Sequence, residues 1–219
     1  MKLQEITKRK SQASEPLKGD ATKTAILSAA LQVAEVSGLQ GITIGLLAEK
    51  TSMSKSGVFA HFKAREDLLV EVVREYHRRF EQIVFEPAMA QPKGLPRLRK
   101  MIATWLEITS AAESTGSVFI TGPIEFDDQP GVIRDALVQS VEVWRQALLR
   151  SINEAIQLGH LKDTADPDVI LFQIYSYVLG VHHDVRFLHA VKSLVIAKQL
   201  IEEIISQHMN LETAVDRSI

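Results

Sequence analysis

Apolar residues recur every three or four positions along most of the chain, which is the period of an amphipathic α-helix. The first stripe starts after Thr24 and stops before Gly38, a residue that readily takes the left-handed conformation in which helices end. Its apolar face consists of Ile26, Ala30, Val33 and Ala34, flanked by Leu27 and Leu31. The pattern predicts a helix over residues 24–37.

Two shorter helical segments follow the first one. Thr43 is a good N-cap for a helix that runs to about Thr51, and Ser54 is a good N-cap for another that ends near Phe62. Three short helices with a tight turn between the last two predict a helix-turn-helix unit.

Longer apolar stripes occupy the chain after Arg65. The first of them includes Tyr76, Phe80 and Ile83 and runs to Pro87. Because no run of residues alternates between apolar and polar, the expected fold class is all-α. The other long helices are predicted at about 98–113, 132–158, 166–187 and 191–208.

Turn and cap signals separate these long helices. The sequence "EFDDQPG", Glu125 to Gly131, predicts a solvated turn, and Asp166 followed by Pro167 favours a helix start. The expected organisation is a basic arm at 1–20, a helix-turn-helix domain at 21–65 with its motif at about 43–62, a larger helical domain at 66–210 and a tail at 211–219.

Charge is distributed unevenly, although the net charge of the 219 residues is only -2. Residues 1–65 carry ten Lys and Arg against five Asp and Glu, a net of +5, so the remainder carries −7. This asymmetry favours a polyanionic partner for the N-terminal part. The chain has no cysteine and no apolar run near the ~18 residues that cross a membrane. We therefore expect a cytoplasmic protein without disulfides.

The segment "ILSAALQVAEVSGLQGITIGLLAEKTSMSKSGVFAHFKAREDLL", Ile26 to Leu69, resembles the DNA-binding domain of the TetR/AcrR family of transcriptional regulators. The correspondence runs without a gap through Gly38 and Thr43 to Phe62. The resemblance implies a ligand-responsive regulator that is not an enzyme: a repressor that binds a palindromic double-stranded DNA operator as a homodimer. It also implies that the last two helices pair across a two-fold axis and that the middle helices bind an unknown small molecule.

Candidate DNA-contacting residues lie in the helix-turn-helix unit. Ser54, Lys55 and Ser56 stand at the start of the third helix, where free backbone N–H groups favour phosphate. Gly57 has no side chain, so the helix can lie close to the DNA. With the positions that the resemblance implies, the candidate set is Thr43, Ser54, Lys55, Ser56, Gly57, Phe59, His61, Lys63 and Arg65.

Two positions depart from the family pattern. Phe59 stands where the family usually has tyrosine, and Gly45 stands where many members have arginine. Each change removes a phosphate contact, although the ring of Phe59 can still pack on a sugar or a thymine methyl group or be partly buried. We expect modest intrinsic affinity, offset by the basic arm.

Ligand-binding candidates lie in the larger domain, because ligand sites are apolar with a few placed polar groups. A plain core position is the competing interpretation for each of them. They are Trp105, Phe119, Trp144, Tyr175 and His182.

Patterns for catalysis or metal binding are missing from the sequence. His182, His183 and Asp184 are consecutive, so a helix points them about 100° apart and they cannot share one ion. The acidic turn at 125–131 lacks the spaced glycine and distal glutamate of a calcium loop. We expect no catalytic residue, cofactor or metal. The alternative is a small-molecule-binding or catalytic helical protein that uses the three-helix unit only as scaffold, and a regulator without a ligand also stays open.

Overall fold

The computed structural model describes residues 18–111 and 117–210, and its regular elements there are helices, apart from an isolated antiparallel bridge between Leu161 and Met209. The expected all-α fold class is confirmed for these ranges. The elements are α1 Lys18–Ser37, α2 Ile44–Lys50, α3 Lys55–Phe59, α4 Arg65–Phe80, the π-helical turn η1 Glu81–Phe85, α5 Glu86–Met89, α6 Leu95–Ser110, α7 Val118–Phe126, α8 Val132–Gln157, α9 Pro167–Arg186 and α10 Lys192–His208.

Side-chain caps fix where three of the helices begin. The Thr43 hydroxyl accepts a hydrogen bond from the backbone N–H of residue 46 at 3.2 Å, and the Ser54 hydroxyl accepts one from residue 57 at 3.1 Å. Asp166 accepts two, from the N–H groups of residues 168 and 169, ahead of Pro167. All three predicted N-caps are confirmed, because a cap is a local pattern that the sequence carries by itself. The predicted basic arm falls mostly, and the tail wholly, outside the described residues.

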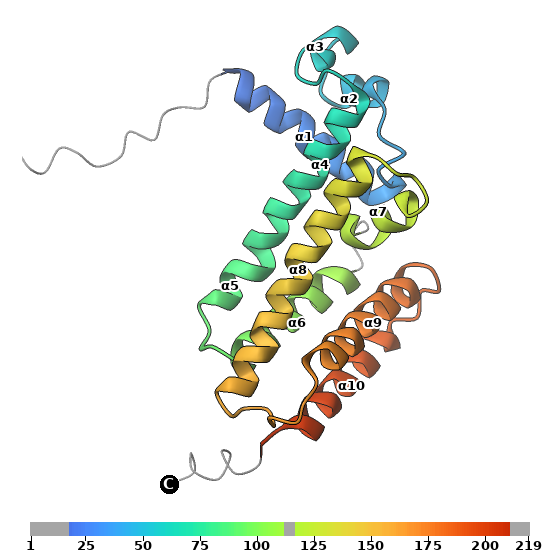
Figure 1. The fold of residues 1–219 in the computed structure, drawn as a ribbon. Helices are drawn as coiled ribbons and strands as arrows, with labels where there is room; N and C mark the ends of the chain where they lie inside the picture. Colours follow the sequence, from blue (N-terminus) through green and yellow to red (C-terminus); the bar gives the residue numbers. More distant parts are fainter. Residues whose placement is uncertain (1–17, 112–116, 211–219) are drawn as a thin grey trace, which may run out of the picture.

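The helices enclose two apolar cores (Figure 1). The N-terminal core joins α1 to α4 as far as Val73, and it also takes in Val118 and Phe126 of α7 and Ile133 and Leu137 of α8. The C-terminal core is built from the rest of α8 together with α6, α9 and α10, and it also takes in Phe80 of α4, Val84 of η1, Ala88 of α5 and Phe119 of α7. Helices α4 and α8 run side by side (Figure 1) and contribute residues to both cores, so both helices connect the helix-turn-helix end to the rest of the molecule.

The long stripe after Arg65 changes register at η1. Phe80 is 3% exposed, as the sequence predicts, but Ile83 is 51% exposed and the neighbouring Val84 is fully buried. A π-helical turn inserts one extra residue per turn, so the buried face moves on by one position. The prediction that Ile83 continues the buried stripe is therefore wrong.

Helix α7 corrects the predicted turn at 125–131. The helix contains Pro123 and extends through Phe126, so Glu125 lies in the helix and the turn starts only at Asp127. Packing of the buried faces of Val118 and Phe126 against the N-terminal core outweighs the helix-breaking tendency of the proline. None of the described helices combines the length and apolar composition that a bilayer-spanning segment requires.

Candidate DNA interface and ligand groove

Helix α3 presents several of the predicted DNA-contacting residues to solvent. Val58 is buried in the N-terminal core and fixes the orientation of the helix. On the outer side Lys55 and Ser56 are exposed, and Phe59 is 50% exposed. A large aromatic ring that stays half exposed on a five-residue helix is available for contact with a partner. Because the other half of its area is buried, the expected partial burial of Phe59 also fits, and its contact with DNA stays a prediction.

Gly57 has a reason within the chain itself. A β-carbon at this position would lie 3.2 Å from the Ser54 hydroxyl oxygen and 3.3 Å from the methyl carbon of Met53, which is tighter than ordinary contact. A side chain there would press on the group that caps α3. Close approach of DNA at Gly57 stays a prediction, since the cap already favours glycine.

The Lys55 side chain crosses over Gly45 of α2. A β-carbon at Gly45 would lie 3.5 Å from Cε of Lys55, an ordinary van der Waals distance, so a longer side chain would compete for the space that Lys55 occupies. Glycine at position 45, where many family members have arginine, thus leaves room for the side chain of Lys55.

The remaining candidates surround α3 at the same end of the molecule. Thr43 and Lys63 are exposed and His61 is half-buried. Arg65 is exposed, and it donates through Nε to the carbonyl of Ile42 at 3.1 Å and through Nη2 to the carbonyl of Gln40 at 3.0 Å; its contact with DNA stays a prediction. It therefore holds the start of α4 to the connection between α1 and α2.

That connection, residues 38–42 (the 38–42 turn), is also held from the larger domain. The carboxylate of Glu125 on α7 accepts hydrogen bonds from the backbone N–H groups of Leu39 at 3.0 Å and Gln40 at 2.8 Å. The Gln40 side chain donates back to the carbonyl of Glu125 at 3.2 Å. Arg65 of α4 and Glu125 of α7 thus both hydrogen-bond to the backbone of the 38–42 turn. The sequence did not reveal this role, because the partners are 85 or 86 residues apart and no local pattern links them.

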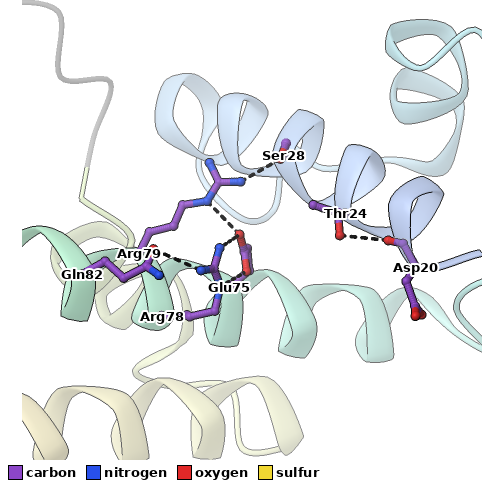
Figure 2. Close-up of polar contacts among 7 residues, drawn as sticks. All are labelled: Asp20, Thr24, Ser28, Glu75, Arg78, Arg79 and Gln82. Atoms are coloured by element: carbon purple, nitrogen blue, oxygen red, sulfur yellow. Dashed lines mark hydrogen bonds and ion pairs between the residues drawn. The ribbon is translucent and has the colours of Figure 1, made fainter. Parts of the chain in front are cut away.

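A second polar connection joins α4 to α1 (Figure 2). Figure 2 shows Arg79 reaching from α4 to the Ser28 hydroxyl of α1, at 2.7 Å, while its Nε donates to Glu75 at 2.8 Å. Arg78 also binds Glu75, through Nε and Nη2, both at 2.7 Å. Hydrogen bonding from Arg78, assisted by Arg79 and opposed by burial, lowers the pKa of Glu75 from 4.5 to about 2. The carboxylate is charged throughout the physiological range.

A groove with a volume of about 640 Å³ opens on the surface between α7, α8 and α9. Three of the predicted ligand residues, Phe119, Tyr175 and His182, line it. Its rim carries Ile124 of α7 and Phe187 at the end of α9, which are 71% and 74% exposed. The size lies within the usual range for small-molecule sites, about 300–1,000 Å³.

His182 is the buried polar group of this groove. Its side chain is only 9% exposed, and Nε2 has no hydrogen-bond partner among the described residues. Burial, with the nearby charges of Arg186 and His183, lowers the pKa of His182 to about 4. The ring is therefore neutral at physiological pH.

Trp105 and Trp144 do not line the groove. Both are buried in the C-terminal core, with ring centroids 5.4 Å apart in an edge-to-face arrangement. Of the two interpretations considered for Trp105 and Trp144, a ligand site or a core position, the structure supports the core position. Trp105 still contacts the groove indirectly, because its ring lies 5.1 Å from that of Tyr175, and Trp144 lies 4.8 Å from Phe80 of α4.

The last two helices have an inner and an outer apolar face. Inner residues such as Ile174 of α9 and Ile201 of α10 are buried in the C-terminal core. We call the outer surface the α9/α10 face. Its large apolar residues are exposed by 39–74% of their area and are Val169, Phe172, Leu179, Phe187, Leu188, Val191, Val195 and Ile196. Leu179 and Phe187 also line the groove, so the two surfaces adjoin.

Two family profiles match the chain. Residues 26–72 match the profile described as bacterial regulatory proteins, tetR family, and residues 94–201 match the tetracyclin repressor-like C-terminal domain. The first covers the helix-turn-helix unit, and the second covers most of the larger domain.

Relatives and solved structures agree with the profiles. The chain is 24% identical over 137 residues to the HTH-type transcriptional repressor AcnR of Corynebacterium diphtheriae; this stretch covers 61% of the chain and 64% of AcnR, less than two thirds of the relative. A TetR regulator from Chloroflexus aurantiacus superposes with a TM-score of 0.79 at 20% identity, covering 88% of this chain and 98% of that one.

The structure of AibR in complex with isovaleryl coenzyme A and operator DNA superposes with a TM-score of 0.64 at 20% identity, covering 86% of this chain and 98% of that one. Likeness at this level of identity establishes the fold. Both profiles, the AcnR match and the solved structures agree with the resemblance found in the sequence, and the chain belongs to the TetR family of bacterial transcriptional regulators.

Proposed function

We propose that the protein is a homodimeric repressor that binds a palindromic operator through the surface around α3 and is released by a small molecule in the α7–α9 groove. The observation that carries the proposal is the outer side of the helix-turn-helix end. Lys55, Ser56 and a half-exposed Phe59 share it with Thr43 and Lys63. Basic and hydroxyl side chains bind phosphates, and the ring suits apolar contact with a base. Such a protein acts in the cytoplasm, where its operator is.

Dimerisation through the α9/α10 face is supported by the exposed apolar residues and by Gly180 in the middle of α9. A β-carbon at Gly180 would meet nothing within 4 Å in the part of the chain that the structure describes, so no neighbour there requires glycine. Glycine in a helix interior costs about 1 kcal/mol relative to alanine. Close approach of a second copy would explain the cost. A stable interface buries about 800 Å² per partner.

Release by a ligand is supported by the position of α7 between the groove and the DNA-binding end. Phe119 and Ile124 of α7 line the groove, while Glu125 of the same helix holds the 38–42 turn. A ligand that displaces α7 therefore acts on the helix-turn-helix unit directly. AibR, which has this fold, has been solved with both a small molecule and operator DNA.

Operator binding is tested by fluorescence anisotropy with labelled DNA from the region flanking the protein's own gene. Lys55→Ala should weaken binding by about tenfold or more and lower the slope of log affinity against log salt by about 0.9, one phosphate contact. Lys93→Ala removes an equal charge from the exposed segment between α5 and α6 and is the matched control. Equal losses in both variants, or none in either, would contradict the proposed interface.

A further inference from the structure

The walls of the α7–α9 groove are apolar along most of their length. Helix α7 contributes Phe119, Pro123 and Ile124, and α8 contributes Val141. Polar groups come from one stretch of α9, which starts at His182. The groove therefore suits an elongated apolar body with a polar group at one end.

The polar end of the groove is positively charged. Arg186 and His183 lie on α9 beside His182, and both act on it electrostatically. Away from this end, about two helical turns before His182 on α9, the guanidinium of Arg145 of α8 lies 5.0 Å from the ring centroid of Tyr175, which also lines the groove. None of the wall residues that the structure describes is acidic.

Two carboxylates lie near the groove: Glu142 of α8 acts electrostatically on Tyr175, and Asp184 of α9 is engaged with other groups. Ser193 donates to it at 2.6 Å, and the ring of His183 lies 3.2 Å from its other oxygen. Neither carboxylate is among the described residues that line the groove.

His182 adds a hydrogen-bonding group that the chain itself does not use. Its Nε2 atom is buried and has no partner in the described part of the chain, and a buried polar atom without a partner is unfavourable. A ligand headgroup in the groove would supply the missing partner.

From these three features we propose that the groove binds an amphipathic anion, an apolar chain or ring system that carries one carboxylate. The apolar body lies along α7, and the carboxylate lies at the end formed by His182 and Arg186. The proposal deepens the proposed function, because it rests on the groove being the effector site and names the chemical class of the effector. A neutral alcohol would gain the apolar contact without the charge, and an amine would be repelled.

The test uses three probes with the same ten-carbon chain: decanoate, 1-decanol and decylamine. Isothermal titration calorimetry with the full chain at pH 7 should give an affinity for decanoate at least about tenfold above that for 1-decanol, and no binding of decylamine. Equal or tighter binding of 1-decanol, or no binding of decanoate, overturns the proposal.

Two variants locate the binding site. Arg186→Gln should abolish the preference for decanoate over 1-decanol, while Arg150→Gln, an equal charge change at an exposed position of α8, should leave it intact. Ile124→Asp, at a rim position that is 71% exposed and can change without unfolding the protein, should weaken binding of both compounds. Unchanged binding in Ile124→Asp and Arg186→Gln overturns the assignment to this groove.

Failure of the proposed function would look different. If decanoate binds the groove but operator DNA is bound equally with and without it, the ligand class holds and the effector role fails. If no operator binding is found at all, the calorimetric result still decides the ligand class, because it requires no DNA.

Discussion

Glu125 should hold the 38–42 turn in place, and Glu125→Ala tests this. The substitution removes the acceptor of two backbone hydrogen bonds, to Leu39 at 3.0 Å and Gln40 at 2.8 Å. Hydrogen bonds to a charged group contribute about 1.5–3 kcal/mol each when buried. These are only part-buried or exposed, so we take about 1 kcal/mol for each and about 2 kcal/mol for the pair.

Two measurements should report this loss. Local opening of the turn becomes about 2 kcal/mol easier, so the amide protons of Leu39 and Gln40 should exchange with solvent about 30-fold faster, as followed by NMR. The midpoint of thermal unfolding should fall by about 4–8 °C, since a protein of this size loses about 2–4 °C per kcal/mol.

The matched control is Asp128→Ala, which removes a carboxylate of equal charge from the exposed turn after α7. It should leave the amide exchange of Leu39 and Gln40 unchanged, because Asp128 makes no contact with that turn among the described interactions. If Glu125→Ala and Asp128→Ala give the same exchange rates, Glu125 does not hold the turn. The proposed connection from α7 to the DNA-binding end then has no support.

Two further predictions follow from contacts elsewhere in the molecule. Gly180→Leu should convert the dimer to a monomer in sedimentation equilibrium, whereas Gln146→Leu at an exposed position of α8 should not; a dimer in both variants would exclude close packing at Gly180. Glu75→Gln should destabilise the protein at pH 7 by at most about 3 kcal/mol. Because the pKa of Glu75 is depressed in the folded protein, its contribution to stability is fully present above pH 4.5 and disappears as the pH falls toward 2. The unfolding temperatures of the wild type and the variant should therefore converge as the pH falls through this window. A difference in unfolding temperature that stays constant would contradict the prediction.

The sequence predicted the helix-turn-helix end well because its signals are local. Thr43 and Ser54 cap helices within three residues of themselves, and Gly38 ends α1 with φ of +72°, the left-handed conformation expected of it. Apolar periodicity likewise located α8 and α10 to within one residue at each end. None of these features depends on residues far away along the chain.

Features that depend on distant partners could not be predicted in this way. Glu125 looked like part of a solvated acidic turn, and only the fold brings it to the backbone of Leu39. Trp105 and Trp144 suit a ligand site and a core equally by chemistry, and the choice is made by which neighbours surround them. Ile83 was misplaced because one π-helical turn, which apolar spacing does not signal, moves the buried face by a residue.

The strength of the Glu125 contact bears on how a ligand could release the operator. Allosteric coupling between two sites usually amounts to about 1–3 kcal/mol. The two hydrogen bonds that Glu125 accepts from the 38–42 turn contribute about 2 kcal/mol of stability, which lies within that range. A ligand in the groove that binds better when α7 has moved can therefore offset the loss of this contact without unfolding the helix-turn-helix unit. If the contact were several times stronger, the binding free energy of an effector of ordinary affinity could not offset its loss. If it were much weaker, its loss would not change the conformation of the 38–42 turn. Coupling is reciprocal, so the ligand and the operator must weaken each other's binding by the same factor. Operator DNA that favours the conformation in which Glu125 binds the 38–42 turn must therefore weaken ligand binding.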